Sequence, residues 1–198
     1  MQSFTCYFLN LRKTKGLTNI NARFVKEGKN KCVFLDRDGV INRELGDYAY
    51  RLDHFELNAG VNESLKKLKD NGFLLIIVTN QAGIAKKLYS KEDVLRCHQY
   101  LQENCGNLID DLYFSPHHPT VTESLLRKPD SLMFEKAMAK YKIEAVRSWM
   151  VGDSPRDIIP AKHMRLRTIG IGKAAEAKPD FMVNGLHEAA GLIIAQTT

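Results

Sequence analysis

Acidic residues at the end of an apolar run give the first sign of chemistry in this sequence. The strand-forming residues 33–35 are followed by Asp36 and Asp38, and then by Gly39. In an open parallel sheet the carboxyl ends of the strands form the edge where ligands bind, so a strand that stops at Asp36 delivers both carboxylates to that edge. Two carboxylates this close repel each other unless a cation lies between them, and Mg²⁺ prefers oxygen ligands. The structural alternative is a solvated loop with an Asx-turn, and residues further along the chain decide between the two.

Later apolar runs also end in polar residues. The run 73–78 and the short run 148–151 both stop at side chains that can bind a phosphate or a metal, and a Lys-Pro pair comes just before a predicted helix. The candidate residues at these places are Thr79, Asn80, Lys128, Asp153 and Asp157. A lone Lys-Pro or Thr-Asn pair is nearly always structural. The whole set, in this order and at the ends of strands, argues against coincidence.

Metal-assisted phosphoryl transfer requires such a set. Asp36 can attack phosphorus only if its own charge and that of the phosphate are screened, which Mg²⁺ and Lys128 would do. Thr79 and nearby backbone N–H groups can hold phosphate oxygens. Asp38 can then protonate the leaving alkoxide and later deprotonate the hydrolytic water.

The elements that must position these residues alternate along the chain. Apolar runs predict strands at 33–35, 73–78, 109–114, 148–151, 167–171 and 181–183. Helical periodicity and end signals predict helices from 61 to the glycine at 72, and at 90–104, 131–141, 155–164 and 186–195. Ser90 and Asp93 suggest a capping box at the start of the second helix. This alternation is typical of a doubly wound α/β fold with a parallel sheet.

The motifs resemble those of the haloacid dehalogenase superfamily of aspartate-nucleophile phosphatases, whose four motifs match Asp36/Asp38, Thr79, Lys128 and Asp153/Asp157. The segments 36–42, 78–85, 115–119, 127–129 and 151–153 are similar to those of the D-glycero-D-manno-heptose 1,7-bisphosphate 7-phosphatases, a group with minimal cap insertions. The similarity covers roughly residues 31–172. It implies a Rossmann-like core with a minimal cap.

The resemblance also implies roles for individual residues. Asp36 would carry an aspartyl-phosphate and Asp38 would act as acid and base, with Mg²⁺ held by Asp36, the Asp38 carbonyl and Asp153. The residues expected on the phosphate or the rest of the substrate are Thr79, Asn80, Arg127 and Lys128. Asp157 would orient Lys128.

One departure from the family pattern concerns zinc. Members commonly carry a Cys-x-His and Cys-x-Cys set before Arg-Lys-Pro, but these places here hold Ser115, His117, Ser124 and Leu126. A structural zinc needs four ligands, so zinc is not expected. The loop is then expected to be held by its prolines and by packing of Val121, Leu125 and Leu126. The change leaves the chemistry intact and bears on substrate identity.

The net charge of +6 is confined to one end of the chain. Seven basic residues and a single acid lie within residues 1–31, so the remainder is neutral. We therefore expect a basic extension at 1–30 and a phosphatase domain at 31–198, with no nucleic-acid groove. The four cysteines show no disulfide or metal spacing, and no run is long enough for a membrane span. A cytoplasmic monomer without membrane partners is expected.

The leading interpretation is a Mg²⁺-dependent phosphatase acting on a small sugar phosphate. The enzyme alternatives are a histidinol-phosphate phosphatase and a polynucleotide 3′-phosphatase, because both share the Asp-x-Asp-Gly and Thr-Asn-Gln motifs. The neutral body disfavours the polynucleotide substrate. A non-catalytic sugar-phosphate-binding module is a third alternative, which the presence of every catalytic carboxylate disfavours.

Overall fold

A six-stranded parallel sheet lies at the centre of the fold in the computed structural model, which describes residues 30–197. Its strands are β1 (Cys32–Leu35), β2 (Leu74–Asn80), β3 (Asp111–Ser115), β4 (Trp149–Gly152), β5 (Arg167–Ile171) and β6 (Phe181–Val183). The strand order is β3-β2-β1-β4-β5-β6. The chain thus builds the sheet outward from β1 in one direction and then, from β4, in the other. The strand order reverses between β1 and β4, and in such sheets this switch point is where ligands bind.

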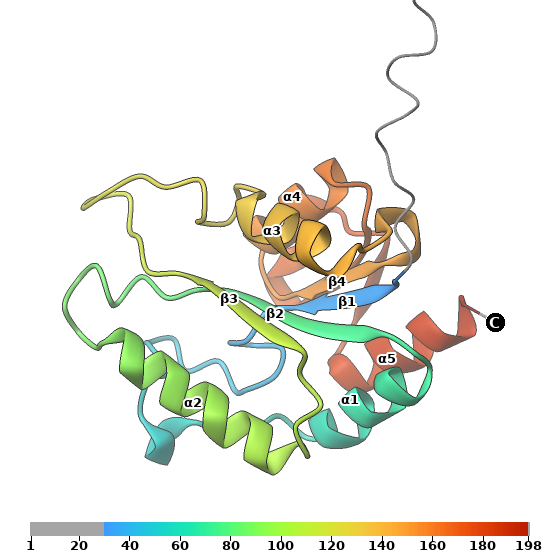
Figure 1. The fold of residues 1–198 in the computed structure, drawn as a ribbon, viewed down its shortest axis with the longest axis horizontal. Coiled ribbons are helices and arrows are strands. Elements are labelled where there is room, and N and C mark those ends of the chain that lie inside the picture. The colour runs from blue at the N-terminus through green and yellow to red at the C-terminus, as the bar shows by residue number, and fades with distance from the viewer. Residues whose placement is uncertain (1–29, 198) are drawn as a thin grey trace, which may run out of the picture.

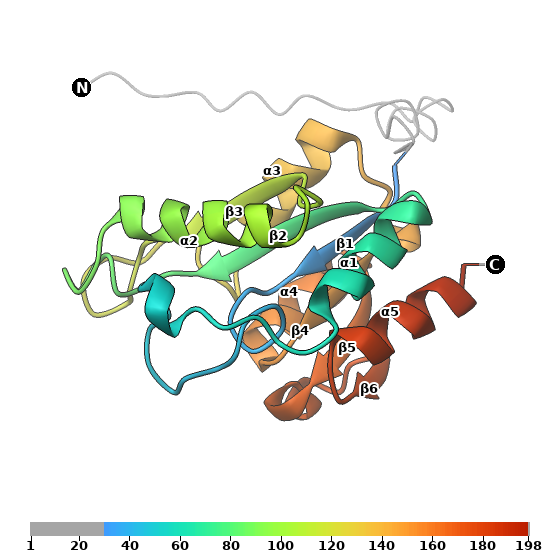
Figure 2. The same ribbon diagram turned by 90° about the horizontal axis from the view of Figure 1, so that it is seen from below.

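Helices cover both faces of the sheet, as Figures 1 and 2 show. The helices are α1 (Val61–Asp70), α2 (Lys91–Asn104), α3 (Leu132–Tyr141), α4 (Pro155–His163) and α5 (Leu186–Ala195). One apolar cluster joins α1, α2 and α5 to one face, and a second joins α3 and α4 to the other. The predicted doubly wound parallel fold is confirmed.

Burial of β1 on both faces of the sheet explains why its sequence is an unbroken apolar run. Val33 and Leu35 belong to the first cluster, whereas Cys32 and Phe34 belong to the second. All four side chains are fully buried. A strand with helices on both faces has no side exposed to solvent, so both the odd and the even positions along it are apolar.

The helix ends follow the signals in the sequence. Ser90 and Asp93 form the expected capping box before α2, and Ser154 and Asp157 form a second one before α4. Strand β2 is longer than predicted and includes Thr79 and Asn80. Its backbone continues to pair with β3 at these two polar residues, with Asn80 opposite Ser115.

The segments around the ligand-binding edge carry little secondary structure of their own. Between β1 and α1 the chain forms a long loop whose only helix is the three-residue 3₁₀ turn Leu52–His54, and the segment between β3 and α3 has no helix. These short insertions agree with the expected minimal cap. Within residues 30–197 none of the helices has the length and apolar character required to cross a membrane.

The expected basic extension falls almost entirely on residues 1–29, which lie outside the described part of the chain. Asn30 was assigned to it as well, but Asn30 already pairs with the segment that precedes β4. Its backbone N–H donates to the carbonyl of Lys142 at 3.2 Å, and its carbonyl accepts from Glu144 at 2.9 Å.

Candidate active site

The register between strands β1 and β4 brings Asp36 and Asp153 together. Leu35, the last residue of β1, pairs with Val151 of β4, and the Asp36 N–H continues this ladder by donating to the Val151 carbonyl at 3.0 Å. Asp153 follows β4 directly after Gly152. Asp36 and Asp153 therefore emerge side by side at the switch point, where both line an open cavity of about 730 Å³.

Lys128 forms the centre of a buried charge cluster. Its Nζ lies 2.9 Å from Asp36 Oδ1 and 2.5 Å from Asp157 Oδ1, and it donates to the Val78 carbonyl at 2.7 Å. The side chains of Lys128 and Asp157 are fully buried. The Asp157 carboxylate also accepts from the backbone N–H of Ser154, the residue just before α4. The lysine is thus held in one place by partners from three elements.

The electrostatics of this cluster favour a further cation. Burial, reinforced by the charge of Asp157, raises the pKa of Asp36 to about 7 despite the opposing effect of Lys128. Burial and the charge of Asp36 raise the pKa of Asp153 to about 6. Burial alone would lower the pKa of Lys128, but Asp157 and Asp36 raise it on balance. Asp36 and Asp157 share one buried lysine, and Asp153 lies next to them without an ion pair of its own to Lys128. A divalent cation would therefore relieve the mutual repulsion of the three carboxylates.

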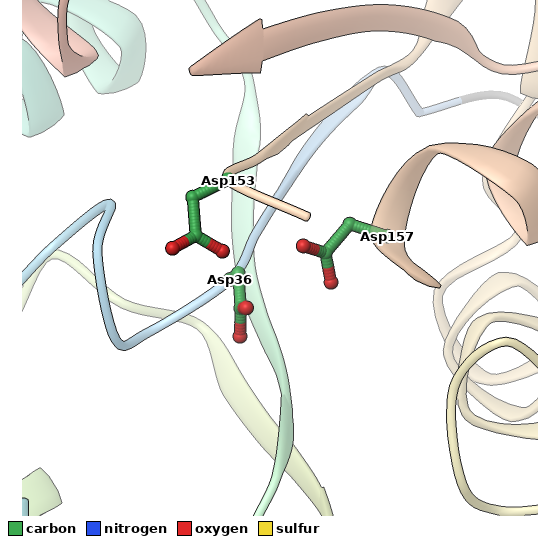
Figure 3. Close-up of side chains that lie close together, drawn as sticks. All are labelled: Asp36, Asp153 and Asp157. Carbon is green, nitrogen blue, oxygen red and sulfur yellow. The ribbon is translucent and has the colours of Figure 1, made fainter. Parts of the chain in front are cut away.

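The geometry of the carboxylates fits such a cation. One oxygen from each of Asp36, Asp153 and Asp157 lies within 4.8 Å of the others, and Figure 3 shows the three side chains close together. Gly39, with φ of +83°, passes so close that a Cβ there would lie 2.1 Å from Asp153 Oδ2. The absence of a side chain at this position therefore lets the loop close over the Asp153 carboxylate, and hard carboxylate oxygens suit Mg²⁺.

The carboxylate of Asp38 is bound by protein donors instead of pointing to the acidic cluster. Arg37 donates to both of its oxygens, Asn42 donates to Oδ1 at 3.0 Å, and Gln81 donates to Oδ2 at 3.1 Å. The metal ligand implied at Asp38 was its main-chain carbonyl, which these side-chain bonds leave unaffected. Asp38 also lines the cavity, as an acid–base group must.

The side chains of Thr79 and Asn80 make different hydrogen bonds. Thr79 lines the cavity, and its Oγ1 accepts from Gln81 at 2.9 Å. The Asn80 side chain donates to the Lys128 carbonyl at 2.9 Å and accepts from the Lys128 backbone N–H at 3.0 Å. Asn80 was predicted to contact phosphate, and it too lines the cavity. Its side-chain amide, with two bonds to the Lys128 backbone, also supports the Lys128 loop.

The loop before Lys128 is not packed as expected. Val121 and Leu125 were predicted to hold it, but their exposed fractions are 58% and 68%. Only Leu126 packs on the second apolar cluster. Polar contacts connect the rest: Arg127 donates to the His117 carbonyl at 3.0 Å, and the backbone N–H of Val121 donates to the His118 carbonyl at 2.9 Å.

Cations gather on the rim of the cavity. The rim side chains that carry or can carry positive charge are His118, Arg127, Arg156 and Lys173. Burial, and then the nearby charge of Arg156, lowers the pKa of Arg127. Two guanidinium groups that destabilise each other in this way would both gain from a bound anion.

A sequence model described as haloacid dehalogenase-like hydrolase matches residues 11–171, which is most of the chain. The chain belongs to this family. Phosphatases of the family generally depend on Mg²⁺, in agreement with the carboxylate cluster.

Curated relatives are phosphatases. A D-glycero-beta-D-manno-heptose-1,7-bisphosphate 7-phosphatase of Haemophilus ducreyi is 36% identical over 172 residues, which are 79% of this chain and 94% of the relative. A D-glycero-alpha-D-manno-heptose-1,7-bisphosphate 7-phosphatase of Photorhabdus laumondii is 36% identical over 143 residues, or 68% and 78% of the two chains. The predicted superfamily and the predicted phosphatase class are confirmed.

Solved structures agree on the fold. The structure of a D,D-heptose 1,7-bisphosphate phosphatase from B. bronchiseptica, complexed with magnesium and phosphate, matches with a TM-score of 0.77 at 21% identity. The match covers 84% of this chain and 99% of that one.

Sequence reasoning missed the residues around Asp38. The sequence does not indicate that Arg37 belongs to the site, because arginine is normally exposed, yet Arg37 is only 2% exposed here. Gln81 directly follows Asn80, so the argument from strand ends could have included it. Arg156 gave no signal, because nothing in its neighbours along the chain places it beside Arg127.

Proposed function

We propose that this chain is a Mg²⁺-dependent phosphomonoesterase that removes the 7-phosphate of D-glycero-D-manno-heptose 1,7-bisphosphate through an aspartyl-phosphate on Asp36. The observation that carries the proposal is the position of Asp36. Its Oδ1 is held by Lys128 at 2.9 Å and by the Arg37 N–H at 2.7 Å, on the floor of an open cavity and beside Asp153. Both contacts engage Oδ1, which leaves Oδ2 to attack phosphorus.

In the first step Asp36 forms a bond to phosphorus while the bond from phosphorus to the sugar oxygen breaks. The electron pair of the broken bond passes to the sugar oxygen, which takes a proton from Asp38. Lys128 stays fixed by Asp157 and Val78, so its charge faces the reacting oxygens without reorganisation. Thr79 lines the same cavity and supplies a hydroxyl to a phosphate oxygen.

In the second step a water molecule attacks phosphorus and gives a proton to Asp38. The bond from phosphorus to Asp36 breaks, which frees inorganic phosphate and restores the carboxylate. Mg²⁺, held by Asp36, Asp153 and the Asp38 carbonyl, would supply charge screening between nucleophile and phosphate. Asp157 supports the site through Lys128 and the first turn of α4.

The cationic rim supports a bisphosphate substrate. When one phosphate is on the floor of the cavity, Arg127 and Arg156 lie on the rim, where the second phosphate would neutralise them. The relatives include phosphatases named for the beta anomer and for the alpha anomer, both 36% identical to this chain. The anomer is therefore a variable for the assay.

The test is a comparison of phosphate release from a set of esters in the presence of Mg²⁺. The set contains both anomers of the heptose bisphosphate, histidinol phosphate and a 3′-phosphorylated oligonucleotide. We expect the highest kcat/KM for one heptose anomer and loss of turnover in chelator, restored by added Mg²⁺. Faster hydrolysis of histidinol phosphate or the oligonucleotide would reject the substrate. Binding of the esters without turnover would reject the enzyme.

A further inference from the structure

A chain of side chains runs from the acid–base residue to the outer loops. Arg37 is buried, and besides Asp38 it donates to the Ala49 carbonyl at 2.6 Å and to Gln81 Oε1 at 3.3 Å. Gln81 is also buried, with 2% of its surface exposed. Arg37 Nη1 has no hydrogen-bond partner among the described residues, but the other contacts of Arg37 and Gln81 connect Asp38 to two loops that border the cavity.

Hydrogen bonds at both ends set the orientation of the Gln81 amide. Its Nε2 donates to Asp38 Oδ2 at 3.1 Å and to Thr79 Oγ1 at 2.9 Å, while its Oε1 accepts from the Tyr89 hydroxyl at 2.8 Å. A flipped amide would place an oxygen against the Asp38 carboxylate and an NH₂ group against Arg37. The network therefore has one favourable arrangement.

Tyr89 anchors the outer end of the network. Its ring stacks on Tyr50 at 4.9 Å between centroids and meets Tyr48 edge to face at 5.6 Å. The ring also lies against Gly83, where a Cβ would come within 2.0 Å of it. Burial raises the pKa of Tyr89, so the phenol keeps its proton and remains a donor to Gln81.

We infer that Gln81 and Tyr89 are positioning residues for the acid–base step, and that Tyr89 acts on Asp38 only through the Gln81 amide. This inference rests on the proposed function, in which Asp38 gives its proton to the leaving oxygen. Removing the Tyr89 hydroxyl takes away the shorter of the two hydrogen bonds to Gln81 Oε1 and, of those that the structure describes, leaves only the Arg37 contact at 3.3 Å. The amide is then less firmly held, and so is the Asp38 carboxylate that it donates to. The Tyr89 hydroxyl contacts Gln81 and is not part of the cavity lining. Gln81 also donates to Thr79, so any change in phosphate binding through Thr79 should be the same for all phosphate esters.

Leaving-group dependence separates this role from a purely structural one. An alkyl phosphate needs a proton on the departing oxygen, whereas 4-nitrophenyl phosphate releases a stabilised anion and needs little help. The parameter to compare is kcat/KM, because it reports the steps up to cleavage of the ester bond and excludes the later hydrolysis of the phosphoenzyme.

The experiment measures kcat/KM with Mg²⁺ for 4-nitrophenyl phosphate and for the alkyl ester that the wild type hydrolyses fastest. The variants are Tyr89→Phe, Gln81→Met and Asp38→Asn. The control is Tyr141→Phe, because the Tyr141 hydroxyl also donates to a carboxylate, that of Asp111 at 3.1 Å, but near the amino end of β3. Thermal midpoints of all variants are recorded to exclude unfolding.

We expect Tyr89→Phe to lower kcat/KM for the alkyl ester about tenfold and for the aryl ester less than about twofold. The tenfold loss is smaller than the full contribution of a general acid, because Asp38 itself remains in place. Gln81→Met should widen the gap further, and Tyr141→Phe should leave the ratio unchanged.

Equal losses for both esters in Tyr89→Phe, or no loss for either, would overturn the positioning role. If Asp38→Asn itself shows no leaving-group dependence, the assigned acid role of Asp38 fails instead. A wild type that hydrolyses neither ester rejects both ideas.

Discussion

The floor and the rim of the cavity are built in different ways. On the floor, Asp36 and Lys128 line the cavity, and the buried Asp157 lies behind Lys128. The Lys128 ammonium is within hydrogen-bond distance of both carboxylates. On the rim, Arg156 is exposed, and within residues 30–197 its side chain donates only to Ser154 Oγ, at 3.1 Å. Buried groups that share partners have one arrangement, whereas an exposed side chain retains its rotamers.

This difference separates the reaction from the choice of substrate. Residues on the floor must be exact in position to stabilise a transition state, and their mutual contacts provide that. In the proposed function, residues on the rim would contact whichever part of the ester projects from the cavity. Changes to the floor should therefore reduce turnover for every ester, and changes to the rim should affect KM for particular ones.

The largest effect is expected for Asp36→Asn. The amide has nearly the same shape but is a poor nucleophile, so kcat should fall at least about 1,000-fold, which corresponds to about 4 kcal/mol of barrier. Lys128 keeps Asp157 as a partner, so the thermal midpoint should change little. Steady-state phosphate release and a thermal melt check both points. Activity within about tenfold of wild type would remove Asp36 as the nucleophile.

The next effect tests whether the floor is also a stability element. Lys128→Met leaves Asp36 and Asp157 without their shared cation, and breaking such a buried pair typically costs about 3–5 kcal/mol. We expect a fall of this size in the free energy of unfolding, measured in urea at pH 7, together with loss of turnover for every ester.

The double variant Lys128→Met with Asp157→Asn provides the control. It removes one unpaired charge and should regain part of the stability but none of the activity. Equal stability of the single and double variants would show that the unpaired Asp157 charge is not what destabilises Lys128→Met.

Gly39→Ala tests the metal site with a smaller change. A Cβ would meet Asp153 Oδ2 at 2.1 Å, so the carboxylate must move and Mg²⁺ should bind at least about tenfold more weakly. Magnesium dependence of turnover and direct titration by calorimetry both measure this. Gly106→Ala is the matched control, because Gly106 also has a positive φ, +69°, but nothing lies within 4 Å of an added Cβ. Similar Mg²⁺ affinity in the two variants would contradict a metal at Asp153.

Much of the fold was predictable because its strands are buried on both faces. Unbroken apolar runs mark such strands, and the predicted bounds of β5, β6 and α5 agree with the structure. The extension of β2 through Thr79 and Asn80 was not predictable from polarity. Pairing with β3 stabilises an extended backbone there, and the sequence does not reveal which strand will be the neighbour.

The candidate site was predictable to the extent that strand ends determine it. Asp36 and Asp153 meet because β1 and β4 are adjacent, as the argument from parallel strands requires. The contact of Asn80 with the Lys128 backbone joins residues that are 48 positions apart, and no local pattern indicates it. Burial of Arg37 is likewise a tertiary result, because an arginine can be buried only when its partners surround it. The chemical roles of these residues stay predictions until variants are assayed.

The smallest effect is expected on the rim, for Arg156→Gln. Arg156 is exposed and lies near Arg127, where the second phosphate of a bisphosphate would bind. We expect KM for the heptose bisphosphate to rise about fivefold with kcat within about twofold, because water screens an exposed charge. KM for 4-nitrophenyl phosphate, which has no second phosphate, should not change. The control Arg147→Gln removes a cation from the 3₁₀ turn Ala145–Arg147 before β4, at the opposite end of that strand, and should leave both KM values unchanged. If Arg156→Gln instead lowers kcat for both esters, the division between floor and rim is wrong at this position.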